Sequence, residues 1–131
     1  MCERANIILT EYQKDIARVL IEYLRDNKET ISYTELFRMM GNGSPRTIGN
    51  RIGDISTKCN QKNYPLISVK VVSNTTGKPS RGFWGLYQTL NLASEEEIRN
   101  RKLKRQFLAI ENTRVEEFTN WGELLKYLEQ E

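Results

Sequence analysis

The chain has 131 residues, of which 38% are hydrophobic and 28% charged, and its formal net charge is +3. This length and composition are typical of one globular domain, and no apolar run approaches the roughly 18 residues of a transmembrane helix. The absence of histidine excludes serine–histidine and cysteine–histidine triads, HNH-type nuclease centres and histidine-based metal sites. We therefore expect no enzyme activity, no metal ion, no cofactor and no small-molecule substrate.

The cysteines and the first residues predict the cell compartment. Cys2 and Cys59 provide neither a disulfide framework nor the spacing of a metal site. The start of the chain lacks a long apolar run followed by a small-residue cleavage site, which argues against a secretory signal. We therefore expect a cytoplasmic protein with reduced thiols and no contact with a membrane.

Positive charge is concentrated in the middle of the chain. Residues 44–81 contain seven Lys or Arg residues and a single acidic residue, Asp54, whereas the segments on either side contain more acidic than basic residues. A surface that binds nucleic acid needs such a block, because each neutralised phosphate releases counterions. The alternative is an ordinary solvated surface.

The first part of the chain predicts two helices joined by a short extended piece. Thr10 and Gln13 form a capping-box pattern before apolar residues at helical spacing, which predicts a helix over about residues 11–26. The extended piece covers residues 31–33, and its serine begins a second capping box. The glycine-rich residues 41–43 end the second helix, because glycine tolerates the left-handed conformation found at helix ends.

A third helix is predicted to begin with Ser44 as its cap and Pro45 as its first residue. Apolar residues at helical spacing form its core stripe: Ile48, Ile52, Ile55 and Cys59. The opposite face carries five residues: Arg46, Gly49, Asn50, Gly53 and Thr57. A glycine inside a helix costs about 1 kcal/mol relative to alanine, so the two glycines indicate close approach of another backbone. That backbone is either a DNA strand or another helix of the protein. The stripe makes Cys59 a buried thiol and not a nucleophile.

A β-hairpin is predicted after the third helix. Residues 66–72 are β-branched and partly alternating, residues 73–80 have turn chemistry, and residues 82–87 form the returning strand. This order of elements is that of a winged helix. We therefore predict an α+β fold, a winged helix-turn-helix with a small antiparallel sheet and a C-terminal helical extension.

The remaining residues are predicted to be helical. Ser94 and Glu97 form a third capping box before a helix that runs through residues 98–110, and Asn120 caps a last short helix. The glutamates 95–97 complement the dipole of that first helix. A basic cluster follows, which either adds DNA contacts or forms a solvated helix face: Arg99, Arg101, Lys102, Lys104 and Arg105.

Two units are predicted along the chain. Residues 1–92 form the winged-helix DNA-binding domain, and residues 93–131 form a C-terminal helical extension packed on the same domain. The alternative for residues 94–131 is a contact with a protein partner or with a second copy of the chain.

Residues 30–85 resemble the DNA-binding domain of the alkylguanine DNA alkyltransferases and the alkyltransferase-like proteins. Residues 32–36, SYTEL, match that family's "sYgeLa" element, and residues 46–49, RTIG, match its "RaVG" element. The valine pair 71–72 through Gly77, followed by residues 82–83, matches the strand and the wing. The resemblance implies that Tyr33 lies against a phosphate and that Arg46 is a finger inserted into the base stack. It also implies docking in the minor groove.

The residues that perform the family's reaction are missing. In an alignment through the valine pair, Ser68 and Val69 take the places of the reactive cysteine and the histidine that follows it. Neither can accept an alkyl group, because that reaction needs a thiolate activated through histidine. Cys59 lies upstream on the core face and is no substitute. Alkyl transfer is therefore excluded.

The predicted DNA-binding residues come from the third helix, the basic block around the hairpin loop and, through the resemblance, Tyr33. Arginine and asparagine side chains pair with base edges, and lysines in a wing position the protein on the phosphate backbone. The predicted set is Tyr33, Ser44, Arg46, Thr47, Asn50, Arg51, Thr57, Lys58, Lys70, Lys78 and Arg81.

The function expected from these features is that of a non-catalytic module that binds double-stranded DNA through the third helix and the wing. The chain is also similar to winged-helix modules attached to prokaryotic or phage nucleases, which implies a targeting or regulatory role of prokaryotic or phage type. One alternative is a phage-type protein-interaction factor, such as a nuclease inhibitor or adaptor. Another is a non-enzymatic reader of damaged or modified bases.

Overall fold

The structure, a computed structural model, is mostly helical. It describes residues 8–27, 29–79 and 81–129, without the side chains of Pro45, Arg46, Asn50 and Arg81. Its elements in chain order are α1 (Glu11–Asp26), β1 (Ile31–Ser32), α2 (Tyr33–Met40), α3 (Pro45–Gln61), the 3₁₀ turn η1 (Ile67–Lys70), β2 (Val71–Val72), α4 (Arg81–Thr89), α5 (Glu95–Arg99), α6 (Arg101–Glu117) and α7 (Trp121–Glu129). None of the helices in these ranges combines the length and the apolar character that a membrane span requires.

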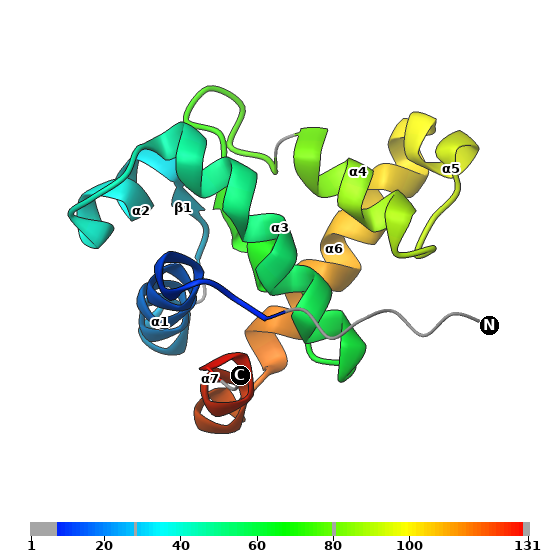
Figure 1. The fold of residues 1–131 in the computed structure, drawn as a ribbon. Coiled ribbons are helices and arrows are strands. Elements are labelled where there is room, and N and C mark those ends of the chain that lie inside the picture. Colours follow the sequence, from blue (N-terminus) through cyan, green and yellow to red (C-terminus); the bar gives the residue numbers. More distant parts are fainter. Residues whose placement is uncertain (1–7, 28, 80, 130–131) are drawn as a thin grey trace.

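The helix α3 is the element against which most of the others pack. It contacts α1, α2, α4, α7 and η1, and it runs through the middle of the molecule in Figure 1. The predicted stripe Ile48, Ile52, Ile55 and Cys59 is buried, with no side chain more than 5% exposed. The prediction of this core face, and of Cys59 as a buried thiol, is confirmed.

Caps fix the ends of the first helices where the sequence predicts them. Both hydrogen bonds of the Thr10–Gln13 capping box are present, and Ser32 Oγ and Ser44 Oγ accept the backbone N–H groups of Glu35 and Thr47. Gly41 ends α2 in the left-handed conformation, with φ of 78°. The predicted boundaries of these three helices are therefore confirmed to within a residue or two.

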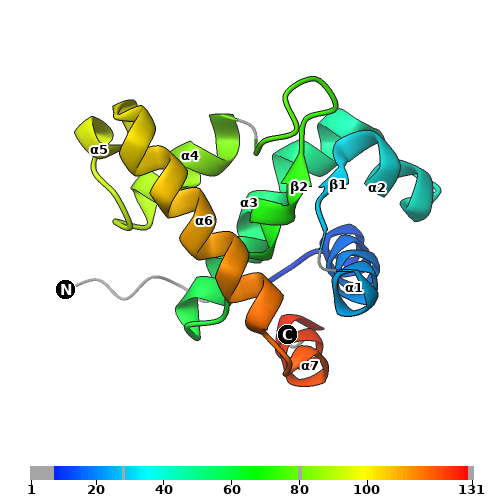
Figure 2. The ribbon, with the colours of Figure 1, turned by 180° about the vertical axis from the view of Figure 1, so that it is seen from behind.

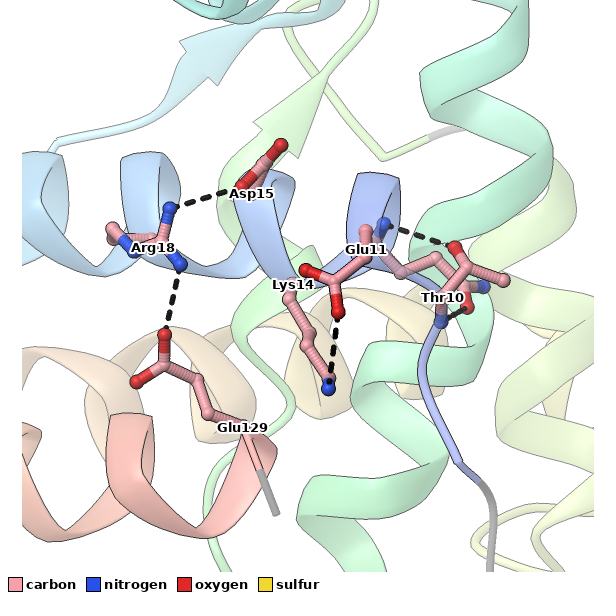
Figure 3. Close-up of polar contacts among 7 residues, drawn as sticks. Thr10, Glu11, Lys14, Asp15, Arg18 and Glu129 are labelled. Carbon is pink, nitrogen blue, oxygen red and sulfur yellow. Dashed lines mark hydrogen bonds and ion pairs between the residues drawn. The ribbon is translucent and has the colours of Figure 1, made fainter. Parts of the chain in front are cut away.

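The first helix, α1, is tied to both α3 and the C-terminal helix α7. Gln13 Nε2 donates to Asp54 Oδ2 at 2.8 Å and to the backbone carbonyl of Arg51 at 3.2 Å. Arg18 donates to Glu129 Oε2 on α7 at 2.9 Å (Figure 3). The apolar face of α7, with Leu124 and Leu128 fully buried, completes the core beneath α1 and α3.

The predicted winged helix with an antiparallel sheet is wrong. The sheet has only two strands of two residues each, and they are parallel, with Ile31 opposite Val71 and Ser32 opposite Val72. They run in the same direction because α2 and α3 form the crossover between them (Figure 2). Residues 67–70, expected within a long strand, form η1 instead. Every residue from 66 to 72 is buried, and a continuous buried apolar run does not distinguish a strand from a turn of helix.

The predicted returning strand at residues 82–87 is also wrong, because this segment lies in α4. Phe83, Trp84 and Tyr87 fall on one face of that helix and are at most 7% exposed. Tyr87 packs on Phe107 of α6, with ring centroids 5.5 Å apart. These aromatic residues predicted a strand from the sequence. Their packing against another helix overrides that β-propensity.

The helix predicted through residues 98–110 is interrupted at Asn100. This residue ends α5, and its Oδ1 accepts the backbone N–H groups of Lys102 at 3.0 Å and Leu103 at 3.1 Å, so it caps α6. Asparagine is among the best N-cap residues because its side-chain oxygen satisfies N–H groups that have no partner within the helix. The chain therefore turns between α5 and α6.

The substitution Asn100→Ala is expected to lower the free energy of unfolding by about 1 kcal/mol, because it leaves the first N–H groups of α6 without an acceptor. Asn100→Asp keeps the acceptor and is expected to be nearly neutral. Urea unfolding followed by circular dichroism measures both. An equal loss in the two variants would contradict the cap.

Candidate nucleic-acid interface

The outer face of α3 lies opposite its buried stripe and carries Arg46, Gly49, Asn50, Gly53 and Thr57. A Cβ added to Gly53 would meet no atom of the described residues within 4 Å, and one added to Gly49 would lie 3.7 Å from a ring carbon of Tyr33, an ordinary contact. Packing within the protein therefore does not require either glycine. Among the described residues, tight helix packing is therefore not the reason for either glycine.

Three predicted contact residues form local hydrogen bonds at the start of α3 or within it. Ser44 Oγ accepts the Thr47 N–H at 3.1 Å and lies 2.8 Å from Thr47 Oγ1. Thr57 Oγ1 donates to the Gly53 carbonyl at 3.0 Å. Ser44, Thr47 and Thr57, which were all predicted to contact DNA, therefore form hydrogen bonds within α3 or at its cap.

The loop of residues 73–79 lies next to the start of α2. It is closed by a hydrogen bond from the Ser73 N–H to the Lys78 carbonyl at 3.0 Å. Asn74 Nδ2 donates to Thr34 Oγ1 at 2.8 Å. Tyr33, the neighbour of Thr34, is half-buried with its ring beside Gly49 of α3. The loop, the start of α2 and the outer face of α3 are therefore adjacent, and Lys78 is exposed on the loop.

Two predicted contact residues are buried and do not belong to this surface. Lys70 is 2% exposed, and its Nζ donates to Glu116 Oε2 at 2.6 Å. Lys58 is 5% exposed, and its Nζ lies 5.3 Å from the centre of the Tyr127 ring. Burial, and then the charge of Lys14, lower the pKa of Lys58. The partners on α6 and α7 are distant in sequence, so spacing gave no sign of these contacts.

The remaining predicted residues differ in what the structure describes. Arg51 is exposed on α3, close to Gln13 of α1. Arg46, Asn50 and Arg81 lie within α3 and α4, but their side chains are outside the described residues. Their contact with a ligand stays a prediction.

Ser68, which the predicted resemblance aligns with a reactive cysteine, belongs to a buried hydrogen-bonded pair with Ser56. Ser56 Oγ donates to Ser68 Oγ at 2.6 Å and accepts the Ser68 N–H at 3.2 Å. Both serines are at most 5% exposed. Cys59 is also buried, and burial raises the pKa of its thiol to about 12. Neither group is placed to act as a nucleophile, because a reactive thiol needs exposure and a lowered pKa.

Three acidic side chains of α6 and α7 have basic partners: Glu111, Glu116 and Glu129. Glu111 is 3% exposed and accepts hydrogen bonds from Tyr87 and Arg114. Glu116 pairs with Lys70, and Glu129 with Arg18. Burial and the Glu111 carboxylate raise the pKa of Tyr87 to about 12. Within the described ranges, no group of three His, Cys, Asp or Glu side chains gathers to hold a metal ion.

Comparisons with protein-family models, with curated proteins and with solved structures found no match to this chain. Its function must therefore be argued from its own residues.

Burial of Cys59 predicts a large difference in reactivity between the folded and the unfolded chain. In a Cys2→Ser variant at pH 8, iodoacetamide should label folded Cys59 at least about 100-fold more slowly than the urea-unfolded chain, where the thiol pKa is about 8.5. Mass spectrometry of quenched samples measures both rates. Rapid labelling of the folded chain would contradict the buried, protonated thiol.

Proposed function

We propose that this chain is a non-catalytic module that binds double-stranded DNA through the outer face of α3, with loop 73–79 against the phosphate backbone. The observation that carries the proposal is that packing among the described residues requires neither Gly49 nor Gly53, since an added Cβ would meet at most the Tyr33 ring, at 3.7 Å. Two alanines at these positions would stabilise the helix by about 1 kcal/mol each. Because the protein's own packing does not explain the glycines, the close approach of an external backbone explains them best.

The arrangement of charge supports the same surface. Arg46 is the second residue of α3, Arg51 is exposed in the next turn, and Lys78 is exposed on the adjacent loop. Arg81 follows at the start of α4. The buried lysines 58 and 70 reduce the basic block, and we propose that Arg46, Arg51, Lys78 and Arg81 supply its remaining contacts with phosphates. Four cations matched to four phosphates supply a salt-dependent affinity typical of DNA-binding modules.

Two further features favour binding without catalysis. The serine pair replaces the reactive cysteine of the family that residues 30–85 resemble, and its hydroxyls are used for each other. The resemblance also suggests roles for Tyr33 at a phosphate and for Arg46 at the bases. The Tyr33 ring lies beside Gly49 of the outer face, and Arg46 lies in the first turn of α3.

Substitution of the two glycines tests the proposal. Gly49→Ala and Gly53→Ala should each raise the free energy of unfolding by about 0.5–1 kcal/mol. Each should nevertheless weaken duplex binding at least about fivefold, because the added methyl group holds the DNA backbone away. Urea unfolding and fluorescence anisotropy with a labelled blunt duplex measure the two effects.

The matched control is Gly122→Ala on α7, at the opposite end of the molecule from loop 73–79 (Figures 1 and 2). An added Cβ there would also meet no atom of the described part of the chain within 4 Å, so this variant should leave duplex affinity unchanged. If all three variants bind duplex equally well, the outer face of α3 is not the interface. Failure of the wild-type chain to bind duplex would instead favour a protein-interaction factor.

A further inference from the structure

A groove of about 640 Å³ lies between loop 73–79 and the helices α4, α5 and α6. Its basic side chains are Lys78, Arg101, Lys104 and Arg105, and its apolar side chains are Trp84, Ile98 and Leu108. None of the described residues that line it is Asp or Glu. A volume in the range of roughly 300–1,000 Å³ is typical of pockets that hold a small organic group.

The four basic side chains of this groove have no carboxylate partner among the described residues, whereas their neighbours do. Arg99 pairs with Glu95, and Arg114 with Glu111. Lys104 lies with its Nζ 5.1 Å from the centre of the Trp84 ring. Positive charge is therefore concentrated at this groove without internal compensation, which favours an anionic ligand.

The apolar side chains decide which anionic ligand fits. A duplex presents sugar and phosphate to a protein surface and keeps its base faces stacked inside, so it would leave Ile98 and Leu108 uncovered. An unstacked nucleotide offers a flat apolar base beside a charged phosphate. Grooves that bind single strands combine basic residues with aromatic and apolar ones for this reason.

The position of the groove connects it with the proposed duplex surface. Lys78 lines the groove and belongs to the loop that contacts Thr34, beside Tyr33 and the outer face of α3. The start of α3, this loop and the start of α6 follow one edge of the molecule in both views (Figures 1 and 2). A strand that leaves a duplex seated on α3 would reach the groove along this edge.

We propose that the groove of Lys78, Trp84, Ile98, Arg101, Lys104, Arg105 and Leu108 binds single-stranded nucleotides that extend from the duplex. This inference rests on the proposed function and sharpens it, because the preferred ligand becomes a junction of double- and single-stranded DNA. The bases cover the half-buried Ile98 and Leu108, and the arginines and lysines contact the phosphates.

The test compares one labelled duplex in blunt form with the same duplex carrying an overhang of about six thymidines, a length within the range that single-strand grooves occupy. The overhang should tighten binding at least about fivefold. The double variant Arg101→Ala/Arg105→Ala should lose that advantage and bind the blunt duplex as the wild type does. Lys102→Ala is the matched control, since Lys102 is exposed on the same helix but does not line the groove. It should keep the advantage.

The outcomes separate the two proposals. Equal affinity of the wild type for blunt and overhang duplexes would overturn the groove proposal and leave duplex binding intact. Binding of the free thymidine strand without any binding of blunt duplex would overturn duplex binding on α3 and support the groove. If a polyglutamate peptide competes as well as the oligonucleotide, or if Lys102→Ala abolishes the overhang advantage, the groove does not select nucleotides.

Discussion

Burial of one face of α3 is the constraint on which the rest of the structure depends. Ile48, Ile52, Ile55 and Cys59 supply a continuous apolar stripe, and α1, α2, α4, α7 and η1 all contact this helix. Loss of a single large side chain from such a stripe costs about 2–5 kcal/mol. The orientation of α3 is therefore fixed by packing, and its opposite face is presented rigidly to solvent.

The same constraint explains how the basic block divides. Residues of α3 that turn toward the C-terminal helices become buried, as Lys58 does beneath Tyr127, and Lys70 is drawn into a pair with Glu116. Residues on the other side of the helix remain available to a ligand. The charge counted along the sequence is thus larger than the charge left for the proposed DNA-binding surface.

Local chemistry in the sequence predicted the helices well and the sheet poorly. The caps at Thr10, Ser32 and Ser44 act through residues at most three positions away, so they are visible in the sequence. Whether residues 66–72 and 82–87 form strands or helices depends on side chains that are distant in the sequence. The aromatic residues of α4 become helical because α6 offers them a surface, and nothing near them in the sequence reveals it. Within the candidate site, the helical spacing of the apolar residues predicted which residues lie on the outer face of α3. It did not predict the burial of Lys58 and Lys70.

The central claim is that duplex DNA binds to the outer face of α3 and loop 73–79 through a few phosphate contacts. The most direct test is the affinity of the wild-type chain for a blunt duplex of arbitrary sequence at about 50 and 200 mM salt. Four contacts, from Arg46, Arg51, Lys78 and Arg81, predict a loss of about 100-fold between the two concentrations. Absence of binding at the lower concentration, or an affinity that does not change with salt, would contradict the claim.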